Sequence, residues 1–117
     1  MSKAGIDYEQ GVKRFLGRSA LYDKTLGRFL KDGAFSRIRA DVESGDRAAL
    51  LADAHEFKGM CGNIAMPSLY ESSSALVALL RREDCGEDEL ASAYERLDAD
   101  YEAARAAITA AMEEERT

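Results

Sequence analysis

Seven apolar residues near the C-terminal end of the chain recur with alternating spacings of four and three residues. They are Leu90, Tyr94, Leu97, Tyr101, Ala104, Ile108 and Ala111. Such spacing places apolar side chains on one stripe of an α-helix, which is typical of a helix packed in a bundle. We therefore expect a long helix from about residue 88 to residue 114, with this stripe facing the core.

Five further helices are predicted upstream from apolar spacing, capping residues and glycines. Their expected ranges are residues 7–17, 19–31, 35–44, 46–64 and 67–86. Asp7, Ser19 and Asp46 are candidate N-caps, and Gln10 completes a capping box with Asp7. Gly45 suits a helix end and Pro67 a first turn. No stretch alternates apolar and polar residues as a strand would, so the predicted fold class is all-α.

Length and charge limit the fold and the partners. The chain has 117 residues, 16 of them basic and 22 acidic, with a net charge of -6. This length predicts a single domain over residues 1–117, with the bundle core at about residues 34–114. The acidic balance disfavours nucleic acid, which requires a basic stripe on the protein, and also an anionic membrane surface.

The compartment is predicted from what the sequence contains. No apolar run approaches the ~20 residues needed to cross a bilayer, and the first five residues lead into an acidic segment without a signal-peptide pattern. The two cysteines, Cys61 and Cys85, do not make a disulfide framework. We therefore expect a cytoplasmic, reduced protein in which Cys61 is a small core residue.

The only histidine, His55, lies in the helix predicted over residues 46–64, together with glycines that disfavour a helix by about 1 kcal/mol each. A turn of 100° per residue puts Leu50, Phe57 and Ile64 opposite His55. Six residues fall within about 60° of it instead, namely Ala48, Leu51, Ala52, Lys58, Gly59 and Gly62. We predict that His55 points to solvent and that this face docks a partner protein.

The chemistry of these residues suits phosphoryl transfer. An exposed imidazole is largely neutral near pH 7 and offers a nucleophilic nitrogen. Lys58, one turn away, can place its ammonium near an anion that the imidazole acquires, and phosphoryl transfer requires mainly positioning and charge neutralisation. Gly59 and Gly62 remove side chains that would hinder a partner's active site. Leu51 would add an exposed apolar anchor for docking.

Other chemistry has little support in the sequence. One histidine and two cysteines do not supply a cluster of metal ligands, and His55 and Cys61 fall on different helix faces. A cysteine–histidine nucleophilic pair is disfavoured for the same reason, and no glycine-rich loop follows a strand to hold a nucleotide. A core histidine is disfavoured by the helical wheel, and a surface histidine without a role is disfavoured by the neighbouring glycines.

These residues resemble the pattern A-H-x-L-K-G-x-x-x-x-x-G of histidine-containing phosphotransfer (Hpt) domains. The pattern corresponds to residues 54–65, with Ala54, His55, Lys58 and Gly59 in place. The resemblance continues over residues 5–11, 21–30 and 45–50, and so spans nearly the whole chain. Three residues depart from the family pattern, and they are Phe57 for leucine, Met60 for a small residue and Ala65 for the closing glycine.

The resemblance implies an antiparallel up-down four-helix bundle with one or two additional short N-terminal helices. It also implies that His55 accepts a phosphoryl group on Nε2 from a receiver-domain aspartate and later donates it to a second receiver, while Lys58 stabilises the phosphoryl charge. The implied partners are receiver domains of response regulators, of hybrid histidine kinases or of both. No cofactor or metal is expected on this chain, because the Mg²⁺ belongs to the receiver.

Several alternatives stay open. A phosphoryl carrier has no kinase or phosphatase centre of its own, so its status as an enzyme is left undecided. A receiver-binding scaffold without phosphotransfer is the second hypothesis, although a scaffold has no need of His55 or Lys58. An unrelated four-helix adaptor is the third. The chain could be free-standing or part of a larger sensor kinase, and a monomer is the expected state.

Overall fold

The computed structural model describes residues 8–14 and 19–116. Over these ranges the chain forms helices and no strand, so the predicted all-α class is confirmed. In chain order they are α1 (Tyr8–Arg14), α2 (Ser19–Lys31), α3 (Ala34–Ser44), α4 (Arg47–Asn63), α5 (Pro67–Leu80) and α6 (Glu87–Arg116). None of these helices is long and apolar enough to cross a membrane.

The predicted bounds of α2, α3, α4 and α6 agree with the structure to within about two residues, as expected where helix ends fray. The predicted cap at Asp7, the Asp7–Gln10 capping box and the predicted end of the first helix at residues 16–17 lie outside the described residues. Residues 15–18, just before Ser19, also lie outside the described residues, so the prediction that Ser19 caps α2 is not tested.

The predicted end of α5 near Gly86 is wrong, because the helix ends at Leu80. Its apolar spacing stops there, and the Arg82 amide donates to the carbonyl of Leu79, only three residues back. The Arg82 guanidinium then pairs with Asp84 and Glu89, each at 3.0 Å. These contacts hold the charged segment between α5 and α6 as a loop, and the position of Gly86 in the sequence does not reveal them.

The start of α4 is set by two adjacent residues with different capping roles. Gly45 ends α3 in the left-handed conformation, with φ of 73°, which glycine adopts without a steric penalty. Asp46 then caps α4, and its carboxylate accepts a hydrogen bond from the amide of Ala49. These local signals start α4 directly after α3 and place His55 in the middle of α4, as the sequence predicts.

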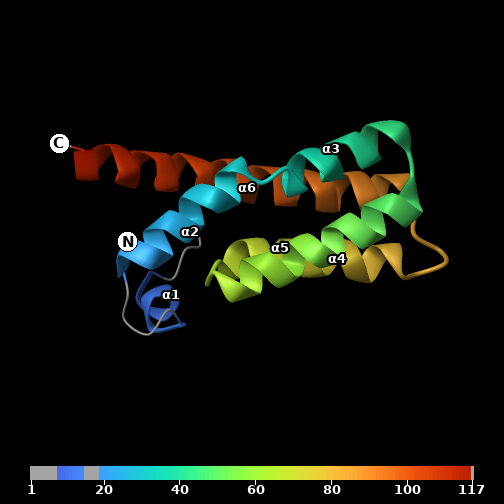
Figure 1. Ribbon diagram of the computed structural model, residues 1–117. Coiled ribbons are helices and arrows are strands. Elements are labelled where there is room, and N and C mark those ends of the chain that lie inside the picture. Colours follow the sequence, from blue (N-terminus) through green and yellow to red (C-terminus); the bar gives the residue numbers. More distant parts are fainter. Residues whose placement is uncertain (1–7, 15–18, 117) are drawn as a thin grey trace.

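The four helices α3 to α6 lie side by side along the length of the molecule, with α1 and α2 at one end (Figure 1). Helix α4 packs between α3 and α5, and α5 packs on α6.

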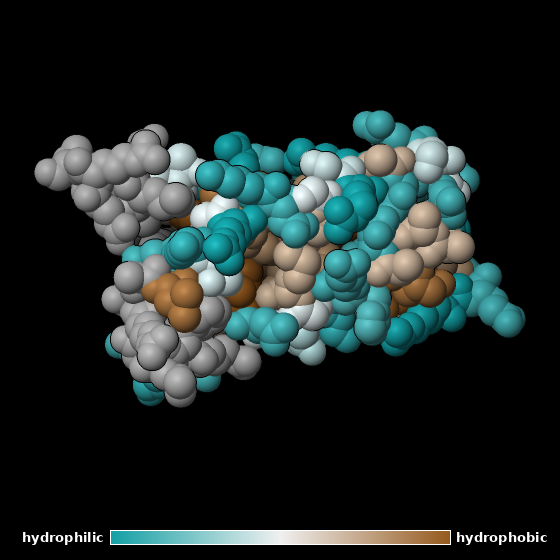
Figure 2. Space-filling view, in the orientation of Figure 1, coloured by the Kyte–Doolittle hydropathy of each residue, from teal (hydrophilic) through white to brown (hydrophobic). Residues whose placement is uncertain are grey.

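The buried core between these helices contains residues from every helix from α2 to α6. Of the predicted stripe on α6, Leu97, Tyr101, Ala104 and Ile108 are buried, whereas Leu90 and Tyr94 are half-buried. The face seen in Figure 2 is mainly hydrophilic, with hydrophobic residues in small areas between polar ones.

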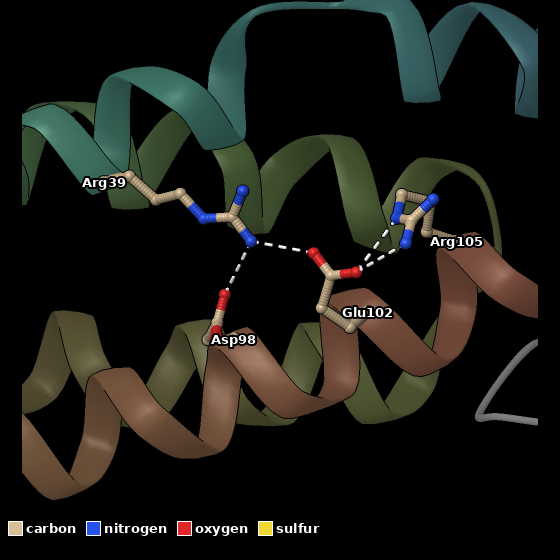
Figure 3. A network of polar contacts seen from close by, with 4 residues as sticks. All are labelled: Arg39, Asp98, Glu102 and Arg105. Carbon is tan, nitrogen blue, oxygen red and sulfur yellow. Dashed lines mark hydrogen bonds and ion pairs between the residues drawn. The ribbon is translucent and has the colours of Figure 1, made fainter.

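Long side chains hold α3 against α6. The rings of Phe35 and Tyr101 are stacked, with centroids 4.0 Å apart and planes 7° apart. On the surface, Arg39 donates hydrogen bonds of 2.8 Å to Asp98 and Glu102, and Glu102 also accepts from Arg105 (Figure 3). Arginines bound to a carboxylate favour its charged form, so the pKa of Glu102 is lowered. Because the ion pairs are half exposed, the buried ring stack contributes more to stability than they do.

Ala65, in the turn between α4 and α5, has a φ of 55° although it is not glycine. The left-handed region is disfavoured for residues with a Cβ. We predict that Ala65→Gly raises the free energy of unfolding by about 1 kcal/mol in urea denaturation. The matched control is Gly45→Ala, which places a Cβ at a similar φ and should lower stability. A loss of stability in Ala65→Gly would contradict the left-handed conformation.

Two carboxyl groups, Asp41 of α3 and Asp53 of α4, meet where these helices pack. The Asp53 carboxylate, to which protonated Asp41 can donate a hydrogen bond, then burial, then the negative charges of Asp53 and Asp46 raise the pKa of Asp41 to about 6, and Arg37 opposes this only in part. The Oδ2 atom of Asp41 is shielded from solvent and accepts no hydrogen bond from the described residues. Protonation of Asp41 removes the repulsion and lets it donate to Asp53.

This pair predicts a pH dependence of stability. Because the pKa of Asp41 is raised on folding, its stabilising contribution is complete below about pH 4 and is lost as the pH rises through about 6. Asp41→Asn keeps a hydrogen-bond donor at every pH. We expect this variant to exceed the wild type in free energy of unfolding by on the order of 1 kcal/mol at pH 7.5, and by much less at pH 4.5. A difference that is equal at the two pH values would contradict this account.

Candidate functional site

His55 is exposed in the middle of α4, and the apolar side of that helix faces the core as predicted. Leu50, Ala54, Phe57 and Cys61 of the same helix are buried. No side chain or backbone group in the described ranges hydrogen-bonds or ion-pairs with the His55 imidazole. Both ring nitrogens are therefore available to a partner, and the core-histidine alternative is wrong.

Small residues surround His55, but Leu51 differs from its prediction. Ala48, Ala52 and Gly59 are exposed, and a Cβ added at Gly59 would have no heavy atom within 4 Å. Leu51 was predicted to be an exposed anchor, whereas it is half-buried and packs against the hydrophobic core. Its large apolar side chain lies at the edge of this face and gains more by turning toward the core than by staying in water. The open surface is therefore made mainly of alanine and glycine.

Gly62, which was also predicted to keep the face open, has a neighbour that the sequence does not reveal. A Cβ at this position would lie 3.3 Å from Cδ2 and Cε2 of Tyr70, which belongs to α5. The missing side chain thus makes room for an aromatic ring of the same chain. Gly59 is open to an approaching protein, whereas Gly62 is covered in part by Tyr70.

Tyr70 also contacts Lys58. The Nζ atom of Lys58 lies 5.6 Å from the centroid of the Tyr70 ring, within the range of a cation–π interaction. No acidic residue in the described part of the chain forms an ion pair with Lys58. Tyr70 was not among the site residues predicted from the sequence, although a signal existed: it is an aromatic residue outside the apolar stripe of α5.

The carboxylates on the other side of His55 pair with an arginine of α3. Nε of Arg37 lies 3.8 Å from Oδ1 of Asp53, and its Nη2 lies 3.9 Å from Oε1 of Glu56. The negative charge of Glu56, the immediate neighbour of His55, is thereby partly balanced. No carboxylate of the described residues balances the positive charge of Lys58 in this way, so this region retains a positive charge that suits an anion.

The remaining residues that the sequence singled out lie away from this face. Met60 is half-buried and packs toward α2, in a hollow shared with Phe29 and Ile64, so it lies clear of the docking face. Cys61 is fully buried as predicted, and burial raises the pKa of its thiol well above the usual range, which keeps it protonated. Among the described residues, no cluster of three or more histidine, cysteine or acidic side chains could hold a metal ion.

A comparison with protein families gives a match to the Hpt domain over residues 26–107, which is more than half of the chain. The chain belongs to the Hpt domain family. The match begins within α2, ends within α6 and includes the whole of α4 with His55, Lys58 and Gly59. Comparison with curated proteins and with solved structures gave no match. The family resemblance read from the sequence is therefore confirmed, and Hpt domains act in phosphorelays through a histidine.

Proposed function

We propose that this Hpt domain relays a phosphoryl group between receiver-domain aspartates through His55. One observation carries the proposal: an exposed imidazole, without a hydrogen-bond partner among the residues that the structure describes, lies on a helix face of small residues in a chain of this family. Receivers of response regulators, of hybrid histidine kinases or of both are its proposed partners. Its place of action is proposed to be the cytoplasm.

The proposed step forms one bond and breaks one. Nε2 of His55 attacks the phosphorus of an aspartyl phosphate, the bond from phosphorus to the aspartate oxygen breaks, and the carboxylate leaves. The proton on Nδ1 stays in place. Lys58 stabilises the charge spread over the phosphoryl oxygens. The Mg²⁺ is supplied by the receiver, and the reverse step on a second receiver discharges His55.

The fold is proposed to serve this step as an antiparallel up-down four-helix bundle. The proposed bundle comprises residues 34–114, in a single domain of residues 1–117 that acts as a monomer. Support comes from the short connections between α3, α4 and α5 and from the packing of successive helices on one another (Figure 1). Such a bundle fixes α4 rigidly and leaves one side of it free for a receiver.

The experiment that tests the function uses a receiver carrying radioactive phosphate on its aspartate. Incubation with this protein should produce label that is lost in acid and stable in base, as a phosphohistidine is. A receiver that binds without passing on its label would favour the scaffold hypothesis, which no observation on the structure supports in particular. Absence of label with a broad panel of receivers would refute the relay.

For Lys58 we predict a change in rate rather than in docking. Lys58→Ala removes the ammonium proposed to stabilise the phosphoryl group but leaves the alanine and glycine surface intact. Transfer to His55 should slow by roughly 10-fold, about 1.4 kcal/mol, while the affinity for an unphosphorylated receiver stays within about twofold. Rapid quench-flow measures the transfer rate, and isothermal titration calorimetry measures the affinity for the receiver. An unchanged rate would remove Lys58 from the mechanism.

A further inference from the structure

Tyr70 is held firmly against the end of α4. It lies in the first turn of α5, where its amide donates a hydrogen bond of 2.9 Å to the carbonyl of Met66. The preceding turn is fixed by a buried hydrogen bond of 2.7 Å from the Tyr22 hydroxyl to the carbonyl of Ile64. The backbone of Tyr70 therefore has a defined place relative to the last turns of α4.

The Tyr70 ring contacts two residues of α4, Gly62 at its edge and Lys58 over its face. Its Cδ2 and Cε2 atoms lie close to Gly62, where an added Cβ would approach them to 3.3 Å, a tight contact. The Nζ atom of Lys58 lies over the ring at 5.6 Å from the centroid. Lys58 and Gly62 are one turn apart on α4, so one tyrosine from α5 contacts both. Tyr70 as a whole remains 42% exposed and borders a hollow of about 510 Å³ that Gly59 and Gly62 also line.

We propose that Tyr70 is a positioning residue that holds Lys58 ready for the phosphoryl group on His55. The inference rests on the proposed function and deepens it. A free lysine side chain samples many rotamers, and ordering it opposes the reaction. A carboxylate would order Lys58 but would also neutralise it, whereas an aromatic face attracts the ammonium and leaves its charge available. Tyr70 thus orders the cation without cancelling it.

The kinetic test compares Tyr70→Leu with Tyr70→Phe, which keeps the aromatic face and loses only the hydroxyl. We use two phosphoryl donors, a phosphorylated receiver and phosphoramidate. With phosphoramidate, Nε2 bonds to phosphorus, the P–N bond breaks and ammonia leaves. Tyr70→Leu should slow labelling of His55 by about two- to fivefold with both donors, and Tyr70→Phe should match the wild type. Slowing with the receiver alone would overturn the proposal and make Tyr70 a docking residue.

A double-mutant cycle shows whether Tyr70 acts through Lys58. In a Lys58→Ala background, Tyr70→Leu should have no further effect on the rate. An equal slowing in both backgrounds would contradict the proposal. Circular dichroism and urea denaturation of all variants check that a rate change does not reflect loss of fold.

A spectroscopic test needs no phosphoryl donor. Because an aromatic ring shields protons above its face, the Lys58 Hε protons should resonate upfield of those of exposed lysines such as Lys24 in the NMR spectrum. The shift should persist in Tyr70→Phe and disappear in Tyr70→Leu. If His55 accepts no phosphate while this shift is present, the proposed function fails and the contact stands. If His55 is labelled and the shift is absent, the positioning role fails alone.

Discussion

Replacement of His55 by glutamine is expected to abolish phosphoryl labelling of this Hpt domain. Glutamine is similar in size and polar, but its amide has no nucleophilic nitrogen. His55 is exposed and forms no hydrogen bond or ion pair with the described residues, so stability should stay within about 0.5 kcal/mol of the wild type. The measurement is the acid-labile, base-stable label acquired from a phosphorylated receiver, and we expect background levels only.

A matched control is Glu56→Gln, which introduces the same residue at the adjacent exposed position. This variant should still be labelled, although loss of the contact with Arg37 changes the local charge. Label that persists on His55→Gln would place the chemistry on another residue and contradict the assignment.

Gly59→Leu is expected to block transfer from a receiver while the fold remains intact. A Cβ at Gly59 meets open space, so the leucine side chain would stand on the surface one turn from His55 and obstruct a docked protein. The labelling rate should fall by at least about 10-fold, or 1.4 kcal/mol. The free energy of unfolding should rise by about 0.5–1 kcal/mol, because leucine favours a helix more than glycine does.

Two controls separate obstruction from other causes. Gly59→Ala raises helix stability in the same way but adds only a methyl group, so its transfer rate should fall much less. Ala99→Leu adds the same side chain at an exposed position of α6 and should leave transfer unchanged. Transfer by Gly59→Leu at the wild-type rate would show that this glycine does not keep a docking face open.

Much of the fold could be predicted because its signals are local. Gly45 and Asp46 fix the junction of α3 and α4 through their own backbone and side chain, and Pro67 is suited to the first turn of α5, where it lies. The end of α5 could not be predicted in this way, because it depends on Arg82 pairing with Glu89 across the loop. Likewise, the bonds from Arg39 to α6 join residues far apart in the sequence (Figure 3).

The same distinction applies to the site. The outward direction of His55 follows from the turn per residue of a single helix, and it was predicted correctly. The surroundings of Leu51 and Gly62 depend on how neighbouring elements pack: Leu51 turned out to be half-buried, and Tyr70 lies next to Gly62. Tyr70 comes close to Lys58 only through the geometry of the α4–α5 pair, which the spacing of residues along one helix does not contain.

The most direct test of the relay is a chase from the labelled protein to a second receiver. The Hpt domain is labelled by one phosphorylated receiver, purified away from it, and mixed with an unlabelled receiver and Mg²⁺. Our account predicts that the acid-labile label leaves His55 and appears on the second receiver as a base-labile aspartyl phosphate. Label that forms on His55 but stays there with every receiver tested would contradict a relay.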